Sequence, residues 1–299
     1  MQYEDYVGII GCGLVGEHLS LDLVHTGWNI CIYDLNEETI ARVLTRVHSQ
    51  NIRGVTSLTE LARQCHTVFI ALPTPAGDNG HDLSAIKTTL DQLQTTKYTG
   101  LILIKSTVCP GTLDKLSTTY RPLRLFHVPE FLSSKTADLD TRLPTQPFVL
   151  LGVPKHTPAA LTDRARCILE HTSRGRQQVI AVQSSESEAT KLFCNAFYAA
   201  KVQLFNEFYQ IAQSQGINYD ILRQMMIHQG WIHPMHTQVP GPDGQFGFGG
   251  ACLPKDTLAL TTWLKNTHTC CPMLQTLGRH SAVRHSSDED MNSNGSDDN

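Results

Sequence analysis

The chain has 299 residues, enough for one large domain or two ordinary ones, and 40% of them are hydrophobic, which suffices for packed cores. The formal net charge is −4, and the last fourteen residues carry five acids and no base, so the rest of the chain is nearly neutral and does not favour a nucleic-acid partner. The nine cysteines form no CxxC pair and no apolar run approaches membrane-spanning length. We therefore expect a cytoplasmic protein with reduced thiols, no bound metal and no membrane partner.

The first half of the chain alternates short apolar runs with helical stretches. The runs are continuously apolar, which is typical of strands in a parallel sheet that is covered by helices on both faces. The pattern predicts an α/β fold with a Rossmann-type doubly wound parallel sheet. Strands are expected at 6–11, 29–34, 66–75, 101–107, 123–131 and 147–152, and helices at 17–25, 36–47 and 83–94.

From about Ser184 the pattern becomes helical. Residues 187–214 contain neither Gly nor Pro and predict one long central helix of about 28 residues, roughly 42 Å. A shorter helix over 219–228, a loop-rich segment over 230–256 and a helix from about 257 to 265 complete a small helical domain. We expect three parts, which are an NAD-binding domain over 1–183, a central helical domain over 184–280, and a disordered acidic tail over 281–299.

The motif GCGLVG, residues 11–16, follows the first predicted strand and opens a helix. Glycines here let a pyrophosphate approach the helix N-terminus, where backbone N–H groups favour anions. Asp34 ends the second predicted strand, where a carboxylate accepts hydrogen bonds from the adenosine ribose and repels a 2′-phosphate, so the motif predicts NAD rather than NADP. A glycine turn that merely packs a helix on a strand is the alternative. The cofactor contacts expected from the motif are Gly11, Gly13, Leu14, Val15, Gly16 and Asp34.

Further motifs follow in the rest of the chain. They are STVCPGT (106–112), PEFLSS (129–134), SEATKLFCNAFYAA (187–200), VPGPDGQFGFGG (239–250) and GFGGACLPKD (247–256). In this order, from about residue 6 to 265, the chain resembles the UDP-glucose/GDP-mannose dehydrogenase family. The resemblance implies oxidation of a nucleotide-sugar alcohol to a carboxylate with two NAD, and a homodimer formed through the long helix.

Oxidation of an alcohol past the aldehyde to the acid needs a covalent bond to the aldehyde. A thiolate can add to the carbonyl, and the thiohemiacetal can lose a second hydride to give a thioester, which water hydrolyses. Cys252, in its glycine-rich segment, fits this role, whereas a small buried filler is the better interpretation of the other cysteines. Lys191 and Asn195 are four residues apart, so they share one helix face, and both can donate to an oxyanion.

The resemblance implies roles for further residues. Asp256 helps proton transfer and orders a water, Glu130 handles a water or proton in thioester hydrolysis, and Thr107 binds a catalytic water. A helix cap or turn is the alternative for Thr107. Thr74 and Thr107 join the cofactor contacts. The substrate contacts implied by the resemblance are Glu130, Phe131, Lys191, Asn195, Phe248 and Gly249.

The chain departs from the family pattern in three respects. The family usually continues with a C-terminal domain that binds the nucleotide, and here the pattern stops near residue 265. Val128 stands where the family often has Asn, and the stretch 230–236 has no arginine. We expect UDP-glucose as the substrate. The alternatives are a GDP-mannose 6-dehydrogenase, a shortened non-catalytic NAD-binding or scaffold protein, and a fragment that another chain completes.

Overall fold

The computed structural model describes residues 6–131, 148–173 and 177–279. The chain forms two compact units. The first unit holds the residues up to Thr74 together with Asp82–Lys191, and the second holds Pro75–His81 together with the residues from Leu192 onward. The boundary predicted from the sequence lies between residues 183 and 184, and the two units divide after Lys191, within one helix. The predicted tail, 281–299, lies outside the described residues.

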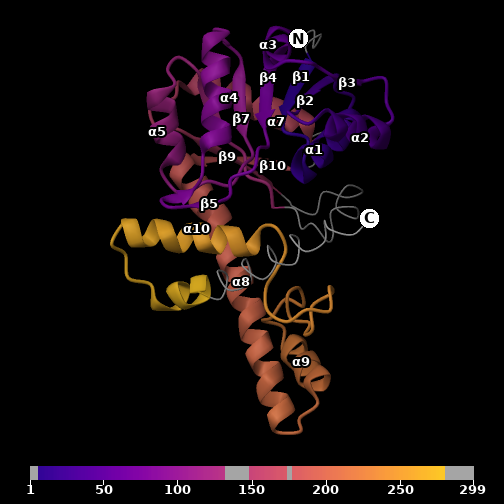
Figure 1. Ribbon diagram of the computed structural model, residues 1–299, viewed down its shortest axis with the longest axis vertical. Helices are drawn as coiled ribbons and strands as arrows, with labels where there is room; N and C mark the ends of the chain where they lie inside the picture. The colour runs from indigo at the N-terminus through magenta and orange to yellow at the C-terminus, as the bar shows by residue number, and fades with distance from the viewer. Residues whose placement is uncertain (1–5, 132–147, 174–176, 280–299) are drawn as a thin grey trace, which may run out of the picture. The chain divides into compact units, whose positions relative to one another are not determined.

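The first unit is built on an eight-stranded sheet (Figure 1). Its strands run in the order β10-β9-β8-β7-β4-β1-β2-β3, and the stretch from β3 to β8 has the strand order of doubly wound dinucleotide-binding folds. The β8–β9 pairing is antiparallel, and the other pairings described in this sheet are parallel. The predicted fold class is therefore confirmed. The strands are β1 (Tyr6–Ile10), β2 (Ile30–Tyr33), β3 (Ile52–Gly54), β4 (Cys65–Ile70), β7 (Leu101–Ile104), β8 (Arg124–His127), β9 (Phe148–Val153) and β10 (Gln178–Gln183).

Helices cover both faces of this sheet, as the continuously apolar strands require. Alternate residues of β4 point to opposite faces: Ile70 packs in one core cluster with residues of α3, α4 and α5, and Phe69 packs in the other with residues of α1, α2 and α7. The helices of the first unit are α1 (Leu14–His25), α2 (Glu37–Val47), α3 (Leu58–Gln64), α4 (Ser84–Thr95), α5 (Thr112–Thr119) and α7 (Ala159–Thr172).

Three predicted strands were too long at their carboxyl ends. The runs expected over 66–75, 101–107 and 123–131 leave the sheet at Ile70, Ile104 and His127. The residues beyond these points are Pro-containing or polar, and they bond to neighbouring loops instead of continuing a strand ladder. These corrections matter because the loops carry predicted site residues.

The second unit is helical and includes a small hairpin from the first half of the chain. Strands β5 (Ala76–Gly77) and β6 (Gly80–His81) pack on α10 (Leu253–Asn266). The Asn266 side chain donates to the Asp78 carbonyl at 3.3 Å and to Asn79 Oδ1 at 3.1 Å. The hairpin thus lies along α10. Helix α9 spans Tyr219–His228, as predicted, and residues 272–279 are also helical.

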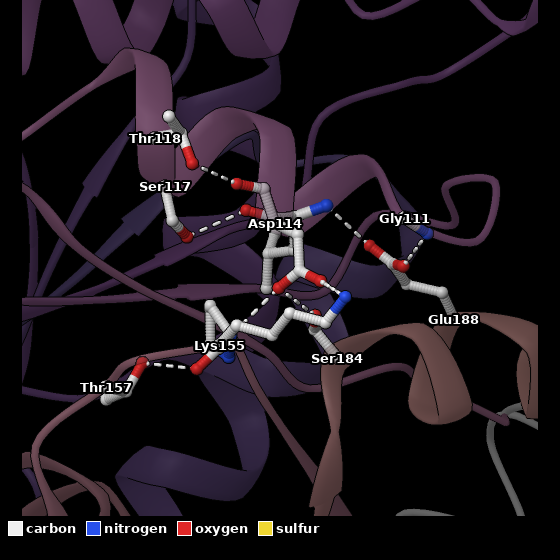
Figure 2. Close-up of polar contacts among 10 residues, drawn as sticks. Gly111, Asp114, Ser117, Thr118, Lys155, Thr157, Ser184 and Glu188 are labelled. Carbon is white, nitrogen blue, oxygen red and sulfur yellow. Dashed lines mark hydrogen bonds and ion pairs between the residues drawn. The ribbon is translucent and has the colours of Figure 1, made fainter.

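Helix α8 (Ser184–Ser214) is 31 residues long and runs from the first unit into the second. Figure 2 shows Glu188 projecting from α8 toward Gly111. Its buried carboxyl accepts the N–H groups of Gly111 at 2.6 Å and Leu113 at 2.7 Å, which the N-terminus of α5 leaves without helical partners. Burial raises the pKa of Glu188 to about 7, although these N–H groups oppose the rise. Because Glu188 fastens α8 to α5, it also fixes Lys191 within the first unit, one turn further along α8.

A second contact at the same place involves Asp114 of α5. Asp114 Oδ1 accepts the Ser184 hydroxyl at 3.1 Å and the Lys155 N–H at 2.9 Å, so the start of α8, the loop after β9 and α5 meet at one carboxylate (Figure 2). Within the described part of the chain, no helix is both long and apolar enough to span a bilayer.

Candidate active site

The glycine loop between β1 and α1 is the first part of the site. Gly11 has a φ of +94°, and a Cβ there would lie 2.5 Å from the Ala71 carbonyl oxygen. A Cβ on Gly16 would lie 1.9 Å from the Gly11 carbonyl oxygen. A Cβ on Gly13 would meet no protein atom within 4 Å. The protein therefore needs glycine at 11 and 16 for its own packing, whereas the open space beside Gly13 fits a pyrophosphate at the N-terminus of α1, where Leu14 and Val15 form the first turn.

Asp34 lies at the end of β2, next to this loop. Its carboxylate accepts the Cys12 N–H at 2.7 Å and the Asn36 N–H at 2.9 Å. The guanidinium of Arg42 donates to the Cys12 carbonyl at 3.2 Å and is paired with the buried Glu17 carboxylate at 3.2 Å. An acid held at this point suits the hydroxyls of an adenosine ribose. The loop and Asp34 together therefore fit NAD.

Thr74 and Thr107, both predicted from the sequence, contact each other in the first unit. The Thr74 hydroxyl donates to the Thr107 carbonyl at 2.7 Å, and the Ser106 hydroxyl donates to the Leu72 carbonyl at 2.7 Å. The loops after β4 and β7 are thus bonded together. Because β1, β4 and β7 are parallel neighbours, these loops leave the same edge of the sheet as the glycine loop.

Glu130, in the loop after β8, is paired with a lysine that the sequence reasoning missed. Lys105 follows β7, is 8% exposed, and places its ammonium 3.0 Å from Glu130 Oε2. The Phe131 N–H donates to Glu130 Oε1 at 3.0 Å, and the Lys191 ammonium lies 5.2 Å from the centre of the Phe131 ring. Burial raises the pKa of Glu130, but the charge and hydrogen bond of Lys105, the Phe131 N–H and the charge of Lys191 together outweigh burial, so the pKa is lowered and the group is ionised at neutral pH.

The second unit contains a buried carboxylate with three side-chain donors. Asp256, in the first turn of α10, is 1% exposed. Its Oδ2 accepts from Asn195 Nδ2 at 2.6 Å, and its Oδ1 lies 3.0 Å from His81 Nε2 and also accepts from Lys255. Burial would raise the pKa of Asp256, but the hydrogen bond from His81 and the charge of Lys255 lower it to about 2. The structure thus brings the predicted Asn195 and Asp256 together and adds His81.

Cys252 is exposed and is the N-cap residue of α10. This corrects the expectation that α10 begins near residue 257: Pro254 is tolerated in the first helical turn, so the helix starts at Leu253 and places Asp256 one turn after the thiol. Phe248 is 3% exposed and packs with Ala199 and Leu277, so its ring belongs to the core of the second unit. Gly249 follows and is half-buried.

Lys105 and His81 could have been noticed in the sequence by one signal. Each is a polar residue that directly follows a recognisable local pattern. Lys105 follows the apolar run LILI, which is expected to be a buried strand, and His81 follows the residues DNG, which are expected to form a tight turn. Neither residue belongs to a sequence motif from which its ion-pair or hydrogen-bond partner could be predicted. Glu130 and Asp256 lie 25 and 175 residues further along the chain, respectively.

The fold, the glycine loop and Asp34 define an NAD-binding protein of the doubly wound class, with a helical second unit that exposes a thiol. Residues 41–165 match the NAD binding domain of the UDP-glucose/GDP-mannose dehydrogenase family, and residues 185–280 match the central domain of the same family. The chain belongs to this family, which is a family of nucleotide-sugar dehydrogenases, and the prediction of NAD as its cofactor is confirmed.

The chain is similar to UDP-glucose 6-dehydrogenase AglM of Haloferax volcanii, with 28% identity over 85% of this chain and 64% of the relative. It is also similar to GDP-mannose 6-dehydrogenase of Pseudomonas savastanoi, with 27% identity over 92% of this chain and 65% of the relative. A solved UDP-glucose dehydrogenase from the archaeon Pyrobaculum islandicum superposes with a TM-score of 0.78 at 21% identity, over 93% of this chain and 68% of that chain. The chain thus spans just under two thirds of the length of these two curated relatives.

The glycine loop predicts that one alanine substitution lowers the affinity for NAD and that another lowers the stability of the protein. Gly13→Ala adds a methyl group where the protein leaves space, so stability should change by less than about 1 kcal/mol while NAD affinity falls at least about tenfold. Gly16→Ala drives a methyl group into the Gly11 carbonyl and should cost about 1–3 kcal/mol of stability or more. Thermal unfolding and NAD titration by calorimetry measure both effects. Unchanged NAD affinity in Gly13→Ala would contradict the assignment.

The Lys105–Glu130 pair predicts a change in the pKa of Glu130. In the wild-type protein this pKa lies below its ordinary value of 4.5, so the carboxyl stays ionised as the pH falls to 4.5. Lys105→Met removes the ammonium and leaves burial in place, so the pKa should rise. A ¹³C NMR titration of glutamate carboxyls, with Glu130→Gln for assignment, measures it. Lys115→Met, at an exposed lysine of α5, is the control and should leave the Glu130 titration unchanged.

Proposed function

We propose that this chain is an NAD-dependent nucleotide-sugar 6-dehydrogenase that oxidises UDP-glucose to UDP-glucuronate in two successive two-electron steps. One observation carries the proposal: an exposed thiol, Cys252, caps α10, and an ionised carboxylate, Asp256, is buried one helical turn later with Asn195 bonded to it. An enzyme that stopped at the aldehyde would need no nucleophile. An enzyme that continues to the acid needs both a nucleophile and groups that manage protons and water.

NAD, held along the glycine loop and Asp34, would supply the hydride acceptor in each oxidation. The Cys252 thiolate adds to the sugar aldehyde to give a thiohemiacetal, whose oxidation leaves a thioester on the same sulfur. Water then attacks the thioester carbonyl, the carbon–sulfur bond breaks, and the carboxylate product leaves with the thiolate restored. Cys252 lies at the N-terminus of α10, where the helix dipole favours a thiolate, which supports its assignment as the nucleophile.

Donors for the oxyanion in this scheme come from α8. Asn195 gives one amide hydrogen to Asp256, which leaves its second hydrogen for an oxyanion. Lys191 is buried and carries its ammonium over the Phe131 ring, and the family resemblance assigns it to oxyanion stabilisation as well. Glu130 and Asp256, both ionised, are assigned to water activation and proton transfer, and Thr107 to holding a water.

UDP-glucose is proposed as the substrate because relatives and solved structures of that name are among those most similar to the chain. GDP-mannose is the second candidate, because a relative named for it matches at 27% identity, close to the 28% of AglM. None of the nine cysteines is in a disulfide, which supports the proposal that the protein works in the cytoplasm.

The exposed side of α8 supports the proposal of a homodimer. Four large apolar side chains are exposed there, and at 100° per residue they fall within about 40° of one another around the helix axis. They are Phe193 (52% exposed), Phe197 (63%), Leu204 (47%) and Ile211 (57%). A straight stripe of this kind can pack against the same stripe of a second copy related by a two-fold axis.

The substrate proposal predicts the stoichiometry of NADH formation. The purified chain with NAD and a limiting amount of UDP-glucose should form two NADH per sugar, measured at 340 nm, and less with GDP-mannose. Cys252→Ala should abolish the second NADH, because no thioester can form. Cys270→Ala, at another exposed thiol of the second unit, should retain both. NAD binding without NADH from either sugar would sink the proposal and leave a non-catalytic NAD-binding or scaffold role.

The dimer proposal predicts the mass in solution. Light scattering should give twice the chain mass of 33.2 kDa for the wild-type protein. Phe197→Asp combined with Leu204→Asp places charges in the stripe and should give the monomer mass. Gln210→Glu, at an exposed position on another side of α8, should not. A wild-type monomer would contradict this assignment of α8.

A further inference from the structure

His81 is a buried histidine that no predicted motif includes. It ends β6, the second strand of the hairpin that lies along α10. Its side chain is 0% exposed, and Nε2 lies 3.0 Å from Asp256 Oδ1. The hairpin is also tied to the far end of α10 by the two bonds from Asn266. The hairpin that carries the imidazole is therefore bonded to both ends of α10, which limits how far His81 can move from Asp256.

Three side chains from three elements face the Asp256 carboxylate. Asn195 of α8 donates to Oδ2, and His81 of the hairpin and Lys255 of α10 face Oδ1. Lys255 is on a flexible stem and its side chain is 22% exposed, so it supplies charge but little orientation. His81 is the rigid, fully buried partner on this oxygen.

The imidazole is neutral in this position. Burial lowers the pKa of His81, and the nearby Lys255 charge adds to that, against the opposing effect of Asp256. Because Asp256 is ionised and can only accept, Nε2 carries the hydrogen of the neutral ring. The contact is thus an N–H donated to a carboxylate, which is a strong and directional type of hydrogen bond.

We propose that His81 is a positioning residue for Asp256: it holds Oδ1 in one orientation and keeps the carboxylate charged, one helical turn from the Cys252 thiol. The inference deepens the proposed function and rests on it for the chemistry that Asp256 serves. Without His81, Oδ1 keeps only Lys255, the carboxylate can rotate about its side chain, and burial is less well offset. Asp256 then accepts a proton at a higher pH and loses its fixed direction toward the water it orders.

Two substitutions separate this role from simple space filling. His81→Gln retains an N–H donor near the position of Nε2 but does not titrate. His81→Phe retains an aromatic ring, which is somewhat larger than imidazole, and removes the donor. His81→Asn, which is smaller and polar but places its amide short of Nε2, serves if His81→Phe does not fold. His228→Phe, at an exposed histidine of α9, is the matched control.

The first readout is the pKa of Asp256 itself, from a ¹³C NMR titration of aspartate carboxyls in the full chain with Asp256→Asn for assignment. We expect a low pKa in the wild-type protein, His81→Gln and His228→Phe, and a raised pKa in His81→Phe or His81→Asn. This readout needs no turnover, so it tests the inference even if no sugar is oxidised. The same low pKa in all of these variants would overturn it.

The second readout is the dependence of kcat on pH with NAD and UDP-glucose. In His81→Phe we expect the plateau value of kcat to fall about tenfold or more because the carboxylate loses its fixed orientation, and we expect the acid limb to move to higher pH, with the NAD KM unchanged. His81→Gln should recover most of the rate. Equal losses in His81→Gln and His81→Phe with no shift of the acid limb would show a purely structural role and contradict the inference. Absence of NADH in the wild-type protein would instead contradict the proposed function.

Discussion

A carboxylate that is buried away from water needs hydrogen-bond donors or cations around it. In this protein, buried carboxylates with such partners join neighbouring helices and loops. Glu17 is 1% exposed and joins α1 to α2 through Arg42 and Arg46. Glu188 is 0% exposed and joins α8 to the N-terminus of α5. Each of these acids joins two elements that border a predicted site. The ion pairs or N–H hydrogen bonds that offset the cost of burying the acid therefore also hold these elements in place.

The two acids assigned to chemistry obey the same rule in different ways. Glu130 is held by one buried ammonium, Lys105, and by its neighbour's N–H. Asp256 is held by an amide, an imidazole and an ammonium from three elements. Both therefore stay ionised at neutral pH, which a base or a water-ordering group requires. The parallel strands add a second constraint: β1, β4, β7 and β8 all deliver their following loops to one edge of the sheet, where the glycine loop, Thr74, Thr107 and Glu130 lie.

Much of this could be predicted from the sequence, because the informative signals are local. The glycine spacing, the acid at the end of β2 and the Gly- and Pro-free run of α8 are all read within a short window. Elements too short or too polar for such signals were missed: β3 has three residues, α5 has eight and the β5–β6 hairpin has two residues per strand.

The partners of the acids could not be predicted, for a different physical reason. Lys105 and His81 gain their roles from packing between distant segments, and His81 is 175 residues from Asp256. No periodicity within one element encodes such a pair. The sequence predicts Cys252 as a thiol in a glycine-rich segment, but only the structure places it at the start of α10 with Asp256 one turn away.

We propose that Cys252 carries the sugar as a thioester. Mass spectrometry tests this most directly. The Glu130→Gln variant, in which thioester hydrolysis should be slow, is mixed with NAD and UDP-glucose, quenched in acid and digested. We expect a mass increase on the peptide that contains Cys252, equal to the acyl sugar nucleotide and removed by hydroxylamine. NADH formation with an unmodified Cys252 peptide would contradict it.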